Sequence, residues 1–275
     1  MLDLSPVLYK AHYGNDRIGE NSISYRAIKY IMELILEYDS KYFCIALDGD
    51  RDKLKRKEVY PEYKSNRNKE RPIEFKTQLP IILEFLDLMG IRYIQHDASE
   101  SDDLLASLSK IFSDSKIKNI ICTSDKDLIQ CKNKYASVAT IKRSGVKILT
   151  KKDFPVDPKS FIQFQAIVGD GVDCVPGCKG IGKLGAKEII DEYKTLENVY
   201  KNLDNLKPRH KKLLDEQRKD VFLSRWLCRL HTKLDLGNIE DYTYSFSYDK
   251  CLEFLEKYGM ETSLYNKLAQ IEFDF

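Results

Sequence analysis

The chain of 275 residues suits one large or two small domains, and its 43% hydrophobic and 32% charged residues are typical of a soluble globular protein. No apolar run approaches the roughly 20 residues of a membrane span, and the first residues lack the layout of a signal peptide. The seven scattered cysteines exclude a disulfide framework and favour reduced thiols in the cytoplasm, with Cys174 and Cys178 as packing residues. The net charge of +2 says little, because 45 basic residues offset 43 acidic ones. Their placement says more, since basic and acidic residues gather in separate stretches, which suggests a polyanion partner and a carboxylate cluster.

The first 150 residues alternate strands with helices. Short apolar runs predict the strands, and apolar residues at helical spacing predict the helices. Strands alternating with helices of this length favour an α/β fold, a mostly parallel central sheet with helices on both faces. The expected strands are 1–3, 42–48, 91–96 and 119–123, the helices are 24–38, 75–90 and 101–114, and residues 136–141 and 146–150 form a hairpin.

After residue 150 the pattern becomes mainly helical. We therefore expect an α/β domain over residues 1–155 and a helical region over 156–275. No linker rich in Pro, Gly or Ser separates them, so the two parts can pack as one unit. The expected helices are 158–168, 183–193, 195–202, 208–217 and 219–231, with one or two more after residue 249.

Acidic residues follow each of the first four predicted strands. Ligands of an open parallel sheet lie beyond the carboxyl ends of its strands, so these acids should meet in one crevice. Asp170 and Asp173 add two more, and on a helical turn they would share a face. Crowded carboxylates favour hard divalent cations, and two Mg²⁺ or Mn²⁺ ions about 4 Å apart could activate water against a phosphodiester. The acids at the strand ends are Asp3, Asp48, Glu100, Asp102, Asp103, Asp125 and Asp127.

The stretch IALDGD permits another interpretation. It resembles the aspartyl-phosphate strand of haloacid-dehalogenase-like phosphatases, with Asp48 as nucleophile and Asp50 as acid. In that family the motif usually opens its domain, and a Thr or Val follows two residues after the second Asp. Here the motif lies on the second strand and Asp52 occupies that position, so the phosphatase is the weaker hypothesis.

A basic segment follows Asp48. From Arg51 to Arg71 there are nine Lys or Arg against four Asp or Glu. Lys64 and Arg67 would share a face of a helix, where a cation pair could grip the scissile phosphate. The ring of Tyr63 beside them could stack on a base. The alternative is a solvated surface loop.

The stretch GCKGIGKLGA, residues 177–186, fits three phosphate-binding patterns. A P-loop needs Ser or Thr after Lys183, where Leu184 stands, and both a P-loop and a dinucleotide fingerprint need a strand directly before them. The preceding VGDGVDCVP is no buried strand. The third pattern, a glycine hairpin between two helices, lets the backbone approach a DNA phosphate without reading the sequence. Its binding residues would be Lys179, Gly180, Gly182, Lys183 and Lys187.

Four motifs in this order resemble a known family. They are YPEYKSNR, ESDDLLASL, TSDKDL and VGDGVDCVPGCKGIGKLGA, and YKNLDNLKPRHKKLL extends the likeness. Together they resemble the 5′-nucleases: the N-terminal domain of bacterial DNA polymerase I, the bacteriophage 5′-3′ exonucleases and, more distantly, the flap endonucleases. The resemblance covers roughly residues 1–235 and implies a PIN-like nuclease core with a gateway segment near 51–72, then a helix–hairpin–helix near 165–193.

The resemblance also implies roles for individual residues. Asp3, Asp48, Glu100, Asp102 and Asp103 would build a first metal site, and Asp125, Asp127, Asp170 and Asp173 a second. Lys64 and Arg67 would contact the scissile phosphate with Tyr63 stacking nearby, and K⁺ would bridge the hairpin to DNA. The stretch between Arg67 and Pro72 is short, so any arch over the site would be small.

The function implied is a structure-specific 5′-3′ exonuclease and flap endonuclease using two Mg²⁺ or Mn²⁺ ions, in DNA replication or repair. Its substrates would be DNA with a 5′ flap, nick or single-stranded 5′ end, or an RNA–DNA hybrid. We expect a monomer in the cytoplasm of a bacterium or a phage-infected host. Because the strand before Asp3 is so short, the alternative is a structure-specific DNA-binding protein with weakened or no catalysis.

Overall fold

A six-stranded sheet forms the centre of the protein. The computed structural model describes residues 1–14, 21–67, 72–142, 145–260 and 262–273. The strand order is β3-β2-β1-β4-β5-β6, with β1 to β5 parallel and β6 antiparallel to β5. The mostly parallel sheet and the terminal hairpin are thus confirmed. The strands are β1 (Leu2–Asp3), β2 (Cys44–Ala46), β3 (Arg92–Ile94), β4 (Asn119–Thr123), β5 (Ala136–Ile141) and β6 (Val146–Ile148).

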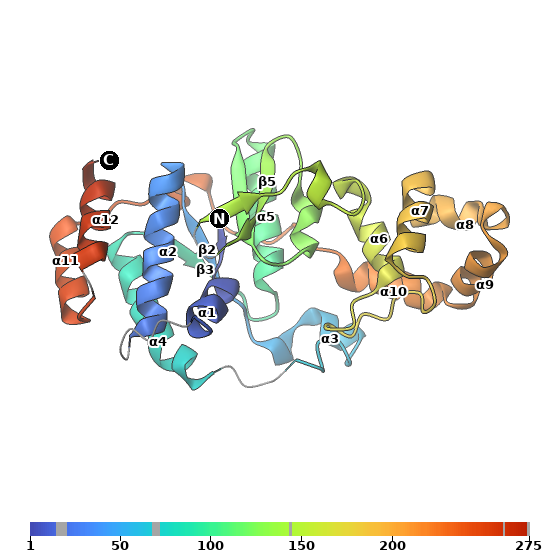
Figure 1. Ribbon diagram of the computed structural model, residues 1–275, viewed down its shortest axis with the longest axis horizontal. Helices are drawn as coiled ribbons and strands as arrows, with labels where there is room; N and C mark the ends of the chain where they lie inside the picture. The colour runs from blue at the N-terminus through green and yellow to red at the C-terminus, as the bar shows by residue number, and fades with distance from the viewer. Residues whose placement is uncertain (15–20, 68–71, 143–144, 261, 274–275) are drawn as a thin grey trace.

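Helices cover both faces of the sheet, as predicted (Figure 1). Side chains alternate along each strand, so Ile45 packs on the face of α2 (Ser22–Tyr38) and α4 (Ile73–Leu88). Its neighbours Cys44 and Ala46 pack on the opposite face with α5 (Ser101–Asp114). Burial on both faces explains why these strands read as continuous apolar runs.

Two short helices were not predicted. Helix α1 (Leu4–His12) begins directly after β1 and buries Leu4, Val7, Leu8 and Ala11, the spacing of one helical face. With no loop between strand and helix, the sequence offers no boundary signal. Helix α3 (Lys55–Val59) lies inside the basic segment, whose residues 68–71 fall outside the described residues.

The helical region has a core of its own. It contains α6 (Phe161–Val168), α7 (Lys183–Tyr193), α8 (Leu196–Lys201), α9 (Pro208–Glu216) and α10 (Arg218–Cys228). Their buried faces form one cluster that includes Ile167, Ile190 and Leu214. Residues 158–160 are a 3₁₀ turn before α6, and α10 ends three residues earlier than predicted because the backbone of Arg229 is extended.

The end of the chain returns to the sheet. Helices α11 (Tyr248–Lys257) and α12 (Thr262–Phe273) lie beside α2 and α4, at the end of the molecule opposite α7 to α9 (Figure 1). Phe254 packs on Phe85 with ring centroids 5.4 Å apart. The division into 1–155 and 156–275 stays a prediction, and in the structure the residues from about 230 onward pack with the α/β core. In the described part of the chain, no helix has both the length and the apolar character needed to cross a membrane.

Candidate active site

Asp3 lies at the centre of the acidic edge, the name used here for the nine predicted acids beyond the carboxyl ends of the strands. It is only 4% exposed, and its Oδ2 accepts a 3.0 Å hydrogen bond from Thr123. Burial, followed by the charges of Asp48 and Asp125, raises the pKa of Asp3 to about 7. Strand β1 pairs with β2 on one side and β4 on the other, so two residues suffice to hold Asp3. The reason for expecting weakened catalysis is therefore removed.

Asp48 and Asp102 lie beside Asp3. Asp48 accepts 2.7 Å from the hydroxyl of Ser5 and 3.4 Å from the amide of Ser101, so it joins the starts of α1 and α5. Asp102 is half-buried, and desolvation followed by the charges of Asp125 and Asp3 raises its pKa. Among the described residues, Asp3 Oδ1 and Asp102 Oδ1 are buried carboxylate oxygens without a hydrogen-bond partner. Such orphaned anionic oxygens are costly unless a cation binds them.

Asp125, Asp127, Asp170 and Asp173 form the second half of the acidic edge. The amide of Asp127 donates 2.8 Å to Asp125 Oδ1. The pKa of Asp127 is raised, mainly by burial and then by the negative charges of Asp125, Asp170 and Asp173. Asp170 and Asp173 do not lie on a helical turn, since Asp170 pairs with Val175 and closes a tight loop after α6. The loop nevertheless brings both acids near Asp127.

Lys64 and Arg67 both reach the acidic edge, although not from a helix. They lie in a turn in which Lys64 has a left-handed backbone with φ of 57°. The Lys64 ammonium contacts Glu100 and lies 3.6 Å from Asp173 Oδ2. Arg67 Nε donates 2.6 Å to Asp173 Oδ1. The predicted shared helical face is wrong, but the cation pair faces the acids.

Tyr63 is placed differently from the expectation that its ring stacks on a base. The side chain is 5% exposed and packs with Leu54, Val175 and Leu227. Its hydroxyl donates 2.9 Å to Glu100 Oε2, and burial followed by the charge of Glu100 raises its pKa. A buried ring offers no face to a base, so Tyr63 orients Glu100 instead.

Arg56 is a buried residue that the sequence did not single out. Its guanidinium donates 2.9 Å to Glu100 and makes a two-point contact with Asp103 at 2.6 and 2.8 Å. The amide of His231 also donates to Asp103. Although burial works against ionisation, these bonds lower the pKa of Asp103. Both oxygens of Asp103 are thus engaged by protein groups, which differs from the direct metal ligation expected for it.

The fit of the acidic edge to a metal rests on its unpaired oxygens. As the side chains stand, no group of three or more His, Cys, Asp or Glu in the described part of the chain is positioned to hold a metal ion. Lys64 and Arg67 neutralise Glu100 and Asp173, whereas Asp3 and Asp102 each keep a buried oxygen without a bond. Crowded carboxylates raise one another's pKa, and a bound cation would offset that repulsion. An all-oxygen donor set with orphaned anionic atoms fits Mg²⁺ or Mn²⁺.

The phosphate cradle, residues 177–187, precedes and begins α7. Gly180 has φ of 97°, which only glycine adopts readily, and Gly182 caps α7 with no heavy atom of the described residues within 4 Å of where a Cβ would lie. Gln217 holds the loop by bonds of 2.7 and 2.9 Å to the backbone of Lys179. Helix α6 and a loop precede the cradle, so the strand required by a P-loop or dinucleotide site is not there. Lys183 begins the helix, and Lys187 pairs with Asp191.

The contacts of Asp50 weaken the phosphatase interpretation. Asp50 caps the 3₁₀ turn after β2 by accepting 3.0 Å from the amide of Asp52. Its half-exposed carboxylate also lies 3.8 Å from Lys53. Asp50 therefore stabilises a surface turn, which counts against a role as the acid beside Asp48.

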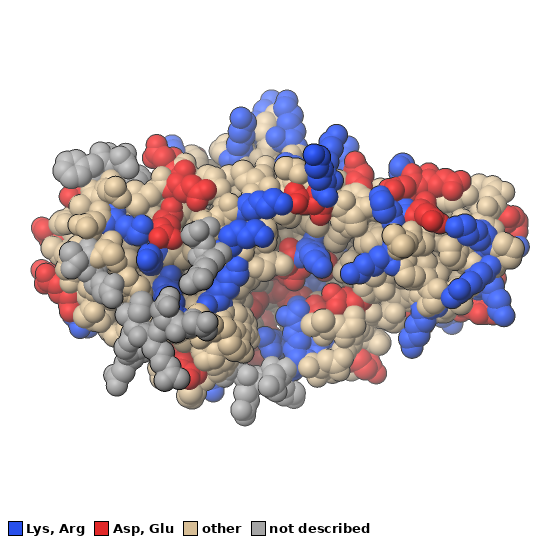
Figure 2. Space-filling model, in the orientation of Figure 1, with Lys and Arg blue, Asp and Glu red and all other residues tan. Residues whose placement is uncertain are grey.

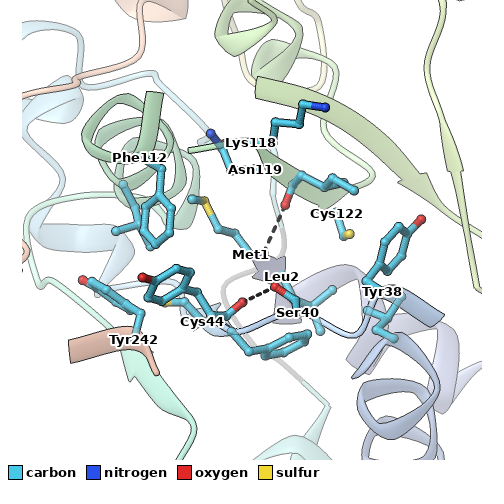
Figure 3. A pocket seen from close by; sticks show the side chains of 15 residues that line it. Met1, Leu2, Tyr38, Ser40, Cys44, Phe112, Lys118, Asn119, Cys122 and Tyr242 are labelled. Carbon is cyan, nitrogen blue, oxygen red and sulfur yellow. Dashed lines mark hydrogen bonds between the residues drawn. The ribbon is translucent and has the colours of Figure 1, made fainter. Parts of the chain in front are cut away.

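The surface view agrees with the placement of the acidic edge. Figure 2 shows acidic side chains in a hollow near the middle of this face, with Lys and Arg side chains along its rim. A cavity of about 210 Å³ lies elsewhere, lined by Met1, Cys44, Asn119 and Tyr242 among others (Figure 3). Met1, Cys44 and Asn119 lie at the amino ends of β1, β2 and β4, the sheet edge opposite the acids. The cavity is therefore separate from the candidate active site.

Comparison with protein families gives two matches that together span most of the chain. The family described as 5′-3′ exonuclease, N-terminal resolvase-like domain, matches residues 1–159. The family described as 5′-3′ exonuclease, C-terminal SAM fold, matches residues 156–251.

Similar proteins include a 5′-3′ exonuclease of Aquifex aeolicus, 34% identical over 88% of this chain and 84% of that protein. DNA polymerase I of Caldicellulosiruptor bescii is 29% identical over 99% of this chain, which spans 32% of that polymerase. Among solved structures, T5 5′-exonuclease with bound zinc has a TM-score of 0.66 at 21% identity, covering 98% of this chain and 96% of the other. The catalytic core of Rad2 with DNA substrate has a TM-score of 0.64 at 17% identity, covering 98% and 89%. These two structures share the fold.

Proposed function

The chain belongs to the 5′-3′ exonuclease family, and we propose that it hydrolyses phosphodiester bonds near the 5′ ends of DNA as a structure-specific exonuclease and flap endonuclease. The observation that carries this proposal is the acidic edge. Carboxylates from four strand ends and one loop meet the side-chain cations of Lys64 and Arg67 there. Among the described residues, two of the buried carboxylate oxygens have no hydrogen-bond partner. That arrangement suits a phosphodiester, whose negative charge needs cations and whose cleavage needs an activated water.

We assign the residues to roles by their contacts. Asp3, Asp48, Glu100 and Asp102 would hold one divalent cation, and Asp125, Asp127, Asp170 and Asp173 a second. Mg²⁺ or Mn²⁺ bound there would supply a water of lowered pKa and charge for the leaving oxygen. Lys64 and Arg67 would bind the scissile phosphate, and each now contacts a carboxylate that it would share with that phosphate. Tyr63 and Asp103 would support the site without touching substrate.

The phosphate cradle would bind the duplex beside the cut. Gly180 and Gly182 allow close backbone approach, no side chain of the described residues caps the start of α7, and Lys179, Lys183 and Lys187 add charge. K⁺ would join the loop carbonyls to a DNA phosphate. The substrates would be DNA with a 5′ flap, nick or single-stranded 5′ end, or an RNA–DNA hybrid, cut by a monomer in the cytoplasm during replication or repair.

Cleavage of a labelled 5′-flap DNA tests the proposal. Wild-type protein should cut near the junction with Mg²⁺ and stop when EDTA removes the metal, whereas Asp125→Asn should cut on the order of 1000-fold more slowly. Asp114→Asn is the matched control, because Asp114 pairs with Lys110 on the exposed end of α5. Wild-type cleavage rates from Asp125→Asn, or cleavage that persists in EDTA, would contradict the assignment.

A further inference from the structure

Arg56 uses every donor of its side chain inside the protein. Nε donates 2.8 Å to the carbonyl of Leu227, Nη1 donates to Glu100 and Asp103, and Nη2 donates to Asp103 and, at 2.8 Å, to the carbonyl of Arg229. Five N–H groups thus meet five acceptors. The side chain is 4% exposed, so these contacts are shielded from solvent.

The acceptors belong to two separate parts of the molecule. Glu100 and Asp103 begin α5 at the acidic edge, whereas Leu227 and Arg229 lie at the carboxyl end of α10 in the helical region. More than 120 residues separate the two sets along the chain. A planar guanidinium with fixed donor directions accepts little change in the relative position of its partners.

The other part of α10 holds the phosphate cradle. Gln217, directly before the helix, makes the two bonds to Lys179, and Ser224 accepts 2.8 Å from the amide of Gly177. A helix of 11 residues is about 16 Å long and resists bending. One rigid element therefore contacts the cradle just before its start and again at Ser224, and contacts Arg56 at its end.

We propose that Arg56 is a positioning residue that fixes the acidic edge at a set distance from the phosphate cradle through α10, and so selects which phosphodiester is cut. The inference rests on the proposed function. Arg56 itself has no donor left for substrate. It holds Glu100 against Tyr63 and Lys64 and locks Asp103, so the first turn of α5 cannot shift along α10.

The matched variants are Arg56→Lys and Arg56→Gln, with Lys110→Gln as the control for loss of one cation on an exposed part of α5. Lysine keeps the charge but cannot reach five acceptors. We expect Arg56→Lys to lower kcat on flap DNA on the order of 100-fold, with KM within about twofold of wild type, because a 1 Å misplacement costs that much. Products should spread over neighbouring positions, whereas Lys110→Gln should cut at the wild-type position and rate.

A second readout needs no cleavage. Mn²⁺ binding, followed by electron paramagnetic resonance without DNA, should weaken about 10- to 100-fold in Arg56→Lys, as for other residues that orient metal ligands. A single cut position with unchanged kcat, or Mn²⁺ affinity lowered only in proportion to the unfolded fraction seen by circular dichroism, would overturn the role of Arg56. Failure of the wild type to cut DNA would instead overturn the proposed function, and the Mn²⁺ titration would still decide on Arg56.

Discussion

The acidic edge and the phosphate cradle differ in the atoms that they present. At the acidic edge the proposed working groups are buried and half-buried side chains, and Asp3, Asp102 and Asp127 have raised pKa values because burial and neighbouring charges oppose ionisation. At the cradle the working groups are backbone atoms, and the lysines around them are exposed. The interaction of a buried charge with its neighbours depends on their geometry and changes little with salt, whereas dissolved salt screens the interactions of exposed charges. Changes at the acidic edge should therefore act on the chemical step, and changes at the cradle on DNA affinity.

The largest expected effect is that of Asp102→Asn. The amide removes one metal-binding charge, so we expect kcat on flap DNA to fall on the order of 1000-fold. The same change relieves repulsion from Asp125 and Asp3 and should raise the melting temperature without metal by about 2 °C. Calorimetry with and without Mg²⁺ measures the melting temperature. Added Mg²⁺ should raise it more in the wild type than in the variant. If the metal-free variant melts at a lower temperature than the metal-free wild type, Asp102 is not destabilised by repulsion from Asp125 and Asp3.

Lys64→Ala should follow with a fall in kcat on the order of 100-fold, since one preorganised cation is lost from the phosphate. It also leaves Glu100 with one contact fewer in a buried site, so metal-free stability should drop. Lys53→Ala is a control, because Lys53 pairs with exposed Asp97 and Asp50. Single-turnover cleavage and thermal unfolding report the two effects. A rate loss no larger than that of the control would remove Lys64 from the chemical step.

Lys183→Glu should change affinity and leave the chemistry alone. We expect flap-DNA binding to weaken about tenfold at low salt, with the logarithmic salt slope smaller by about one and with kcat at saturating DNA unchanged. Fluorescence anisotropy over a range of KCl concentrations measures the slope. If kcat falls and the salt slope stays the same, Lys183 acts on the chemical step, and the division of roles between the acidic edge and the phosphate cradle is wrong.

Two glycine variants give the smallest effects and separate fold from contact within the cradle. Gly180→Ala forces φ of 97° on alanine and brings its Cβ to 3.0 Å from Leu213, so stability should fall by about 1 kcal/mol. Gly182→Ala meets open space and should cost less in stability, yet its methyl group should weaken DNA binding about threefold by blocking a phosphate. Equal DNA affinity in Gly182→Ala and wild type would argue against close backbone approach.

The sequence predicted best what the sheet enforces. Acids after apolar strands must gather at one edge once the strands are parallel, so Asp3, Asp48, Glu100 and Asp125 could be placed before any coordinates. The glycines and lysines of the cradle fit three patterns, and only their context favours the hairpin, because no strand precedes them and Leu184 stands where a P-loop needs Ser or Thr. The role of the cradle in binding DNA stays a prediction.

What the sequence could not predict depends on contacts between distant segments. Arg56 lies in a basic run and looks like any solvated arginine until Leu227 and Arg229 close over it. Tyr63 is expected from the sequence to stack on a base, and its burial depends on Val175 and Leu227. The return of α11 and α12 to the sheet likewise has no local signal, because amphipathic helices do not specify their partners.

The position of α12 also bears on the synthesis of the protein. Leu264, Leu268 and Ile271 share a core with Leu2 and Ile28. A ribosome adding about 5 to 20 residues per second needs on the order of 10 to 50 s between Ile28 and Ile271. Throughout that interval the part of the apolar face of α2 that packs on α12 stays uncovered. All six strands of the sheet that carries Asp3 have then been made, so the growing chain exposes this face, and a risk of aggregation, until α12 follows.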